Sequence, residues 1–233
     1  MAKRQFKAES KRLLDLMVNS IYTHKEIFLR EIISNASDAC DKLCYQALTD
    51  DAVGMSRKDF KIEIKVDKEH RTLTVSDNGI GMDKEDLENN LGVIASSGSY
   101  KFKQEVGDDA KDTDVIGQFG VGFYSAFMVA DHITVVTRKY GTAAAWMWQS
   151  SGADGYTITE CERDAVGTDI IMHIKPDTDD EKYSEFLESW RLQELVRKYS
   201  DYIRFPIRME VSKTRRKEGS PDDKPEYETY QEE

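Results

Sequence analysis

The sequence predicts an α+β protein in which helices and a sheet form two layers. Apolar residues recur at helical spacing before residue 48 and again between 181 and 200. Alternating polar and apolar residues form strands in two blocks, at 60–76 and 133–175. This order of helices and strands agrees with a two-layer architecture.

The length and charge of the chain narrow its class. With 233 residues it is long enough for one large domain or two small ones with a sizeable core. The formal net charge of -11 argues against nucleic-acid binding, which needs clustered Lys and Arg. We find neither a signal peptide nor a stretch as long as a membrane span. We therefore expect a cytoplasmic protein that binds no nucleic acid and no membrane.

The first half of the chain is expected to alternate helices with a hairpin. Amphipathic helices are predicted over 10–22 and over about 25–48. Residues 60–66 and 71–76 read as the two strands of a hairpin. Asp83, with acidic residues after it, is the expected N-cap of a further helix.

The second half is expected to be mostly strand. Small and polar residues from 92 to 114 suggest a lid at about 91–117, which delivers the chain to a glycine cluster at 116–127. A β-meander and a last helix should follow. Their expected ranges are 133–138, 143–149, 156–159 and 169–174 for the strands and about 181–200 for the helix.

The domain is predicted to span residues 1–210. Residues 211–233 are charge-dense and contain two prolines, so they read as a solvated linker. The chain then stops without a closing element, which suggests a piece of a longer protein.

The long helix carries a polar stripe beside its apolar arc. Glu31, Asn35, Asp38 and Lys42 fall within roughly 60° of one another at about 100° per residue. A solvated helix face is the ordinary explanation. Asn and Asp are mediocre residues in mid-helix, however, because their side chains compete for backbone hydrogen bonds. A functional site therefore stays open beside the solvated face.

A second polar motif follows the predicted hairpin. Asp77 precedes Asn78-Gly79, a pair that normally indicates a tight hairpin, but a helix follows instead of a strand. The glycine cluster at 116–127 lacks the ending of a P-loop and the order of a dinucleotide fingerprint. Its glycines would still let backbone N–H groups approach an anion. A metal–nucleotide site could be built from these parts.

The cysteines give a weaker signal. Three cysteines, an odd number, do not suggest a disulfide framework. Cys40 and Cys44 lie four apart on the predicted helix. We expect core or half-buried thiols there rather than a zinc site.

Four motifs in one order carry a family resemblance. They are Glu31-x-x-x-Asn35-x-x-Asp38, Asp77-x-Gly79-x-Gly81-Met82, the run from Gly117 to Ser125, and Gly167-Thr168. With them the chain closely resembles the N-terminal ATP-binding domain of the heat-shock protein 90 chaperone family, bacterial HtpG type, over roughly residues 5–210. The resemblance implies the Bergerat-type fold, a mixed, mostly antiparallel sheet covered by helices on one face. Gyrase, histidine kinases and MutL share this fold.

The resemblance assigns a ligand contact to individual positions. Asp77 would accept a hydrogen bond from the adenine amino group, with Thr168 and an ordered water beside it. Gly81 and Met82 would lie against the base, and Asn35 would coordinate Mg²⁺. The other expected pocket positions are Asp38, Lys42, Asn90 and Leu91.

The resemblance also assigns roles to the residues expected around the phosphates. Glu31 would be the general base that orients the attacking water. The alternative for Glu31 is an ion pair with Arg30 or a lysine. The positions expected to cradle the phosphates through backbone amides are Gly120, Val121, Gly122 and Phe123.

The resemblance thus implies an ATPase domain of a chaperone that binds ATP or ADP with Mg²⁺. Clients and a homodimer would belong to the full-length protein, while this piece would be a monomer with weak hydrolysis, lacking a middle domain. The family's lid usually has Thr and Lys where this chain has Val93 and Ser96. A module that senses nucleotide without useful hydrolysis is therefore an alternative.

Another enzyme of the superfamily is disfavoured. A histidine kinase should carry a phospho-accepting His helix upstream, yet 30 residues precede Glu31. A topoisomerase or mismatch-repair ATPase should show a basic surface, which the net charge of -11 disfavours.

Overall fold

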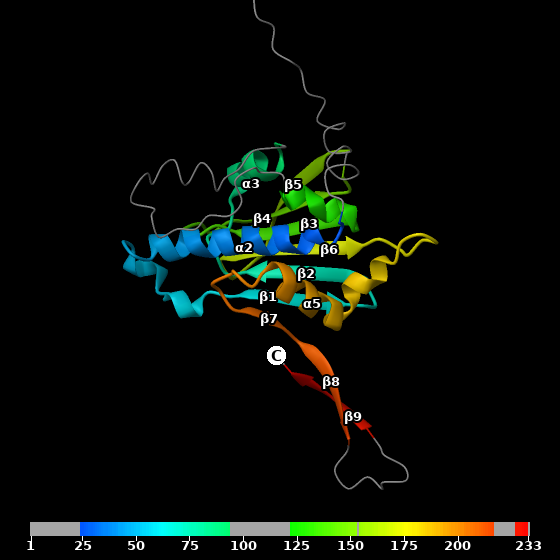
Figure 1. The fold of residues 1–233 in the computed structure, drawn as a ribbon. Helices are drawn as coiled ribbons and strands as arrows, with labels where there is room; N and C mark the ends of the chain where they lie inside the picture. Colours follow the sequence, from blue (N-terminus) through cyan, green and yellow to red (C-terminus); the bar gives the residue numbers. More distant parts are fainter. Residues whose placement is uncertain (1–23, 94–121, 153, 217–226, 233) are drawn as a thin grey trace, which may run out of the picture.

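The computed structural model describes residues 24–93, 122–152, 154–216 and 227–232 (Figure 1). The helix expected over 10–22, most of the expected lid, and the glycine cluster before Gly122 lie outside the described residues. The sequence predictions for these segments stay predictions.

A seven-stranded sheet forms one layer of the molecule. Its order is β5-β4-β3-β6-β2-β1-β7, and every neighbouring pair is antiparallel except β1 and β7. The strands are β1 (Ile62–Asp67), β2 (Thr72–Asp77), β3 (Ala130–Arg138), β4 (Ala145–Ser150), β5 (Tyr156–Cys161), β6 (Gly167–Ile174) and β7 (Ile207–Met209). The predicted mixed, mostly antiparallel sheet is confirmed.

Helices form the second layer. The α-helices are α2 (Ile27–Gln46), α3 (Lys84–Leu91) and α5 (Ser189–Tyr199), and the 3-10 helices are η2 (Asp51–Val53), η3 (Arg57–Asp59), η5 (Gly122–Met128) and η6 (Tyr183–Leu187). Figure 1 shows α2 and α5 in front of the same face of the sheet, and the two helices contact each other. The two-layer prediction is confirmed.

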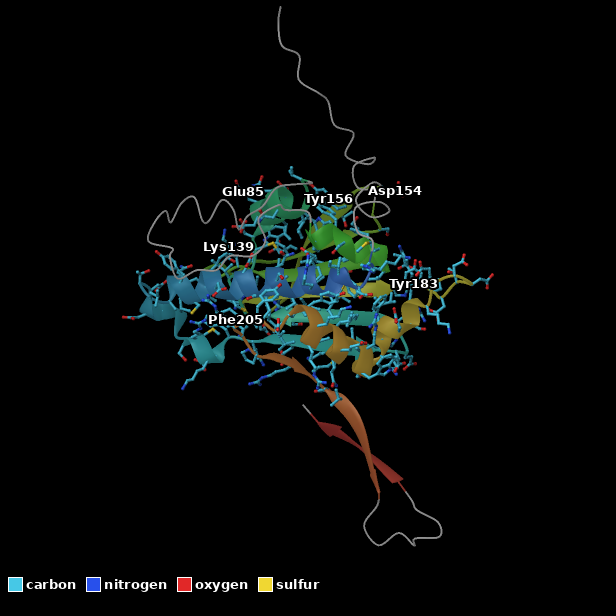
Figure 2. All side chains as sticks on the ribbon, in the orientation of Figure 1. Glu85, Lys139, Asp154, Tyr156, Tyr183 and Phe205 are labelled. Carbon is cyan, nitrogen blue, oxygen red and sulfur yellow. The ribbon has the colours of Figure 1, made fainter. Side chains whose placement is uncertain are left out.

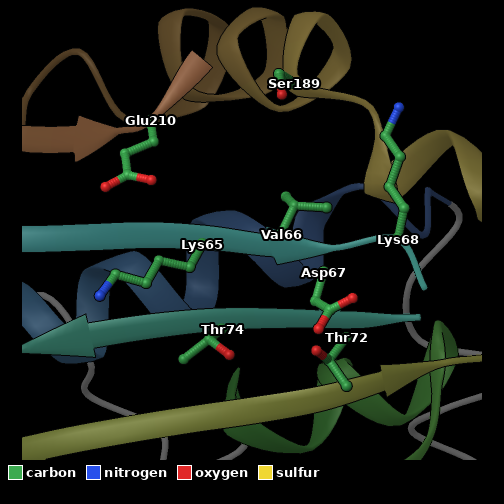
Figure 3. A pocket seen from close by; sticks show the side chains of 8 residues that line it. All are labelled: Lys65, Val66, Asp67, Lys68, Thr72, Thr74, Ser189 and Glu210. Carbon is green, nitrogen blue, oxygen red and sulfur yellow. The ribbon is translucent and has the colours of Figure 1, made fainter. Parts of the chain in front are cut away.

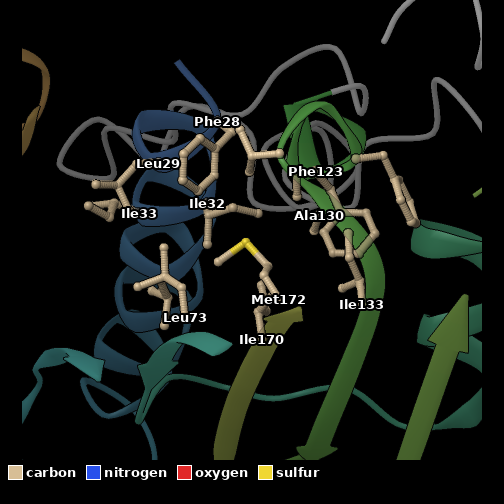
Figure 4. Packing of buried hydrophobic residues seen from close by; sticks show 14 of the residues in the cluster. Phe28, Leu29, Ile32, Ile33, Leu73, Phe123, Ala130, Ile133, Ile170 and Met172 are labelled. Atoms are coloured by element: carbon tan, nitrogen blue, oxygen red, sulfur yellow. The ribbon is translucent and has the colours of Figure 1, made fainter. Parts of the chain in front are cut away.

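The core lies between the two layers (Figure 4). Along β2, Leu73 and Val75 are buried while Thr72 and Thr74 are half-buried, so one face of the strand packs against the helices. In Figure 4, Ile32 of α2 lies opposite the β6 side chains. Burying a large apolar side chain contributes roughly 1.5–3 kcal/mol, so the sheet and α2 hold each other in place.

Helix α3 begins where the sequence predicts. Asp83 is its N-cap and accepts from the N–H of Asp86, whose carboxylate accepts from the N–H of Asp83. The Lys139 ammonium lies 2.7 Å from a carboxylate oxygen of both residues (Lys139 and Glu85 are labelled in Figure 2). Helix α3 is thereby tied to the turn after β3.

The buried thiols agree with the sequence analysis. Cys40 is fully buried in a small cluster with Phe60 and Phe205, and Cys44 is half-buried. Burial raises the pKa of both thiols. The two tryptophans of β4 also pack, since Trp148 is buried in the main core and Trp146 lies against it.

The expected β-meander is wrong at its fourth strand. β6 does not pair with β5 but crosses to lie between β3 and β2. Both faces of β5 are largely exposed, which suits an edge strand. β6 buries Ile170, Met172 and Ile174, and these side chains reach the core only from a central position.

The expected last helix is broken. Glu188 is extended, with φ of -98° and ψ of 121°, so η6 ends before α5 begins. Both carboxylate oxygens of Glu188 lie 2.8 Å from the ammonium of Lys68. Trp190, in the first turn of α5, is 64% exposed.

The last residues differ from the expected solvated linker. β8 (Val211–Arg216) and β9 (Tyr227–Glu232) pair as an antiparallel ladder, and β7 was not predicted at all. Backbone hydrogen bonds can form a ladder without an apolar side-chain pattern, so the composition of this segment did not predict its two strands. The boundary at residue 210 and the absent middle domain stay predictions.

Candidate functional site

Asp77 closes β2 on the helix-covered face of the sheet. It lies opposite Thr168 of β6, and its side chain accepts a hydrogen bond of 2.9 Å from the N–H of Gly79. Only 8% of the residue is exposed. Burial raises the pKa of the Asp77 carboxyl to about 7, although the N–H groups of Gly79 and Thr168 act in the opposite direction. A buried carboxylate of this kind favours a ligand that donates hydrogen bonds.

The turn around Asp77 leaves no room for side chains at its glycines. A Cβ on Gly81 would lie 2.0 Å from the carbonyl oxygen of Arg138, and one on Gly167 would lie 2.1 Å from that of Asp77. Gly81 and Gly167 also have positive φ values, 67° and 120°. The glycines of the predicted motif thus serve close backbone packing that fixes the Asp77 carboxylate.

A buried hydroxyl network completes this end of the site. Thr137 of β3 accepts from the N–H of Met82 at 2.9 Å, and its hydroxyl lies 3.0 Å from that of Thr168. The Thr137 hydroxyl also donates to the carbonyl of Gly167 at 3.1 Å. Thr168 and the Gly81–Met82 turn, predicted separately, are therefore joined through a residue that the sequence analysis missed. The sequence does contain one sign of this role: Thr137 is a polar residue at a position where the alternation along β3 places buried side chains.

Helix α2 brings its polar stripe to this turn. The N–H of Ile80 donates to the carbonyl of Ala39 at 3.0 Å, which fixes the C-terminal half of α2 beside the turn. Asp38 is 1% exposed, and Lys42 is half-buried. Burial lowers the pKa of the Lys42 ammonium, whereas the carboxylates of Asp38 and Asp86 raise it. This part of the stripe is therefore not a solvated helix face.

Glu31 lies farther along the stripe, next to η5. Its carboxylate accepts from Nε of Arg30 at 3.0 Å, and Arg30 also pairs with it through its terminal nitrogen. A Cβ on Gly122 would lie 2.3 Å from the other Glu31 oxygen. The ion pair that the sequence analysis kept as an alternative is present, and the structure also brings Glu31 to the end of the glycine cluster.

The end of α3 lies close to η5. The Tyr124 hydroxyl donates to the carbonyl of Leu91 at 2.9 Å. Leu91 is buried, and Asn90 is half-buried. Phe123 is buried against Trp148, with ring centroids 5.5 Å apart. Its side chain is therefore part of the core, so only its backbone is a candidate for ligand contact.

Magnesium fits the donors that the structure describes. Asn35 is half-buried on α2, one turn from Glu31 and from Asp38. No three His, Cys, Asp or Glu side chains of the described residues converge on one point. A Mg²⁺ ion in nucleotide sites takes few protein oxygens and completes its shell with phosphates and waters. One amide oxygen from Asn35 suits that pattern.

The structure brings together most of the predicted site residues. Gly81 and Met82 lie in the turn that follows Asp77, and Thr168 lies opposite Asp77 on β6. Asp38 and Lys42 lie beside this turn, and Glu31 lies next to Gly122. Gly120 and Val121 lie outside the described residues. The sequence analysis also missed the ion pair between Arg163 and Asp169, whose charges act on Asp77.

A separate depression lies away from these residues (Figure 3). It has a volume of about 460 Å³ and lies between the β1–β2 hairpin and the start of α5. Its lining residues are Lys65, Val66, Asp67, Lys68, Thr72, Thr74, Ser189 and Glu210. Lys68 is already engaged with Glu188. None of the predicted site residues lines this depression.

Comparisons with known proteins identify the family of the chain. The family model described as "Histidine kinase-, DNA gyrase B-, and HSP90-like ATPase" matches residues 22–168, and the model "Hsp90 protein" matches residues 185–233. Chaperone protein HtpG of Clostridium botulinum and that of Bacillus subtilis are each 58% identical over 234 residues, which covers 100% of this chain. The chain spans 37% of the length of each of these relatives. No helix among the described residues is long and apolar enough to cross a membrane.

Proposed function

This chain belongs to the family of histidine kinase-, DNA gyrase B- and HSP90-like ATPases, and from that membership we propose that it binds and hydrolyses ATP at the site around Asp77 and Glu31. The reaction is ATP and water to ADP and phosphate. The buried Asp77 carboxylate carries this proposal.

Asp77 is suited to select adenine. Its carboxylate already accepts from the Gly79 N–H, and a carboxylate has acceptor sites for a further donor. The adenine amino group is such a donor, and the neighbouring Thr168 hydroxyl can hold a bridging water. Guanine presents a carbonyl oxygen at the equivalent position, which would face an acceptor. Adenine recognition therefore follows from the chemistry of one fixed side chain.

The stripe on α2 suits the rest of the nucleotide. In this proposal Asn35 holds Mg²⁺, which neutralises phosphate charge when bound. Asp38 and Lys42 line the sugar side, with Asn90 and Leu91 across from them on α3. The backbone amides of Gly120, Val121, Gly122 and Phe123 bind phosphate oxygens.

Glu31 is the proposed general base. Its contact with Gly122 supports this role, because Gly122 belongs to the short segment whose backbone amides are proposed to hold the phosphates. The Arg30 guanidinium pairs with the Glu31 carboxylate and thereby orients it. The carboxylate would then position the attacking water and take its proton.

The larger function that we propose is that of a chaperone. The relatives named chaperone protein HtpG extend well beyond this chain. We propose that nucleotide binding closes a lid over residues 91–117 and drives a homodimer cycle on client proteins in the longer protein. Phosphate release by residues 1–233, as a monomer, should be slower than by the full-length Bacillus subtilis relative. We expect this difference because an arginine supplied from another part of the longer protein would stabilise the transition state. In other phosphoryl-transfer systems such an arginine increases the rate by roughly 10³–10⁵.

Calorimetry with four ligands tests the proposed specificity. ADP and ATP should bind, and Mg²⁺ should strengthen their binding because it bridges the phosphates. GTP and NAD should not bind, because the first lacks an adenine amino group and the second carries a nicotinamide ribose in place of a terminal phosphate. Equal affinity for ADP and GTP would contradict recognition by Asp77. Absence of phosphate release under any condition would leave a nucleotide-sensing module instead of an ATPase.

A further inference from the structure

Two histidines are neighbours on the open face of the sheet, away from the helices. His132 of β3 and His173 of β6 are cross-strand partners. The residues next to them, Ile133 and Met172, are fully buried in the core. Because side chains alternate along a strand, the two imidazoles share the opposite face. Cross-strand partners have Cβ atoms about 4.5–5.5 Å apart, close enough for both rings to reach one ion.

A β-bulge adds a carboxylate to this pair. The register of β3 against β6 shifts between Ala130 and His132, so Asp131 has no partner of its own on β6. Asp131 and His132 therefore both oppose His173. The Asp131 carboxylate lies 2.6 Å from Nδ1 of His173. The bulge thus aims a carboxylate at one of the two rings.

Both rings are held through the same nitrogen. Nδ1 of His132 lies 3.0 Å from the Ser151 hydroxyl, as Nδ1 of His173 lies next to Asp131. When His173 is neutral and Nδ1 donates to Asp131, its Nε2 carries the lone pair. Metal-binding histidines usually show this arrangement, in which a carboxylate or another polar group orients the ring through the second nitrogen. His173 and Asp131 are also nearly half exposed, at 46% and 45% of their side chains, so an ion can enter from solvent.

We propose that His132 and His173 form a binding site for a divalent transition-metal ion, oriented by Asp131. Imidazole nitrogens suit Zn²⁺, Cu²⁺ and Ni²⁺, whereas Mg²⁺ prefers oxygen ligands. No third His, Cys, Asp or Glu joins these ligands in the part of the chain that the structure describes, so waters complete the shell. The bound ion links β3 to β6 on the face opposite Asp77 and Glu31, and the nucleotide site does not use it.

Zinc titration of the whole chain tests this site. We expect Zn²⁺ to bind and to raise the melting temperature, because a ligand that binds the folded state stabilises it. His132→Gln and His173→Gln should each weaken zinc binding at least tenfold and abolish the shift in melting temperature. Asp131→Asn should weaken binding by about tenfold, the lower end of the range for residues that orient a ligand. An excess of Mg²⁺ should not displace the zinc.

His70 supplies the matched control. Its Nδ1 lies 2.7 Å from Asp67 in the same type of contact, but it lies in the turn between β1 and β2, where no second histidine pairs with it across the described strands. His70→Gln should leave zinc affinity unchanged. Cys44→Ser and Cys161→Ser report on half-buried thiols, the competing zinc ligands. The proposal is overturned if wild-type protein does not bind zinc, if both His variants keep its affinity within threefold, or if the Cys variants remove the binding instead.

Discussion

The two ends of the candidate site are built in different ways. Around Asp77, sheet register and close backbone contacts with glycines fix every group, and a hydroxyl network ties the turn to β3. Around Glu31, the geometry depends on a half-buried side chain, its ion pair with Arg30 and a contact with Gly122. The first end cannot change without disturbing the sheet, whereas the second can change by side-chain rotation. We therefore expect variants near Asp77 to affect affinity and stability, and variants near Glu31 to affect turnover.

The largest effect is expected at the phosphate end. Glu31→Ala should lower the rate of phosphate release by about 10²–10⁴-fold, the usual contribution of a general base. ADP affinity should stay within about threefold, because Glu31 is not proposed to contact the base or sugar. Steady-state phosphate release and calorimetry measure the two quantities. Glu63→Ala, on β1 and paired with Lys61, is the control and should leave the rate unchanged. A Glu31→Ala enzyme with near-normal turnover would make the Arg30 ion pair the whole role of this residue.

The next effect is expected at the base end. Asp77→Asn should weaken ADP binding by about 1–3 kcal/mol or more, because an amide can present a donor to the adenine amino group. The fold should persist, since the amide oxygen can still accept from Gly79. Asp67→Asn is the matched control, because Asp67 also ends a strand but is exposed. Calorimetry and a thermal melt distinguish lost recognition from lost structure.

Two glycines with similar backbone angles differ in how closely they are packed. Gly81 and Gly141 have φ values of 67° and 78°, but nothing lies within 4 Å of a Cβ on Gly141. Gly141→Ala should cost about 1–2 kcal/mol of unfolding free energy through its left-handed backbone. Gly81→Ala carries the same strain and adds overpacking of roughly 1–3 kcal/mol against Arg138. Equal denaturation midpoints would show that the turn near Asp77 is not tightly packed.

The smallest effect is expected from pH. The Asp77 carboxyl has a raised pKa of about 7, and its ionised form is the stronger acceptor for the adenine amino group. ADP affinity should therefore fall as pH drops below 7, by up to about tenfold per unit, and level off above 8. The Asp77→Asn variant should lack this dependence. Identical pH profiles for the two proteins would show that another group titrates.

The same raised pKa affects stability in a defined direction. The folded state holds the Asp77 proton more tightly than the unfolded state, whose pKa is near 3.8. Between about pH 4 and 7 the folded state therefore binds more protons, and this carboxyl makes stability fall as pH rises. Urea unfolding of wild-type and Asp77→Asn protein at pH 5 and 8 measures this contribution.

Local patterns predicted much of the fold and of the site. The helical spacing of the apolar residues correctly predicted α2, and the acidic N-cap correctly predicted the start of α3 at Lys84. The strand–glycine loop–helix order around Asp77 is confirmed, as are the family resemblance and the fold that it implies. These features depend on residues that are close together in the sequence, so they could be predicted from the sequence alone.

Features set by distant contacts were missed. The placement of β6 depends on competition between strand edges, and a strand pattern alone does not contain that information. Glu188, where the helix is broken, pairs with Lys68, which lies 120 positions away in the sequence. Thr137 looked like an ordinary strand residue until β6 brought Thr168 beside it.

Recognition of adenine by Asp77 can be observed in a crystal structure of this chain with ADP and Mg²⁺. We predict that the adenine amino nitrogen lies within about 2.7–3.2 Å of an Asp77 carboxylate oxygen, as a hydrogen bond requires. The phosphates should point along α2 toward Asn35 and Gly122. Adenine bound elsewhere, for example in the depression beside Lys65 and Glu210, would contradict the account.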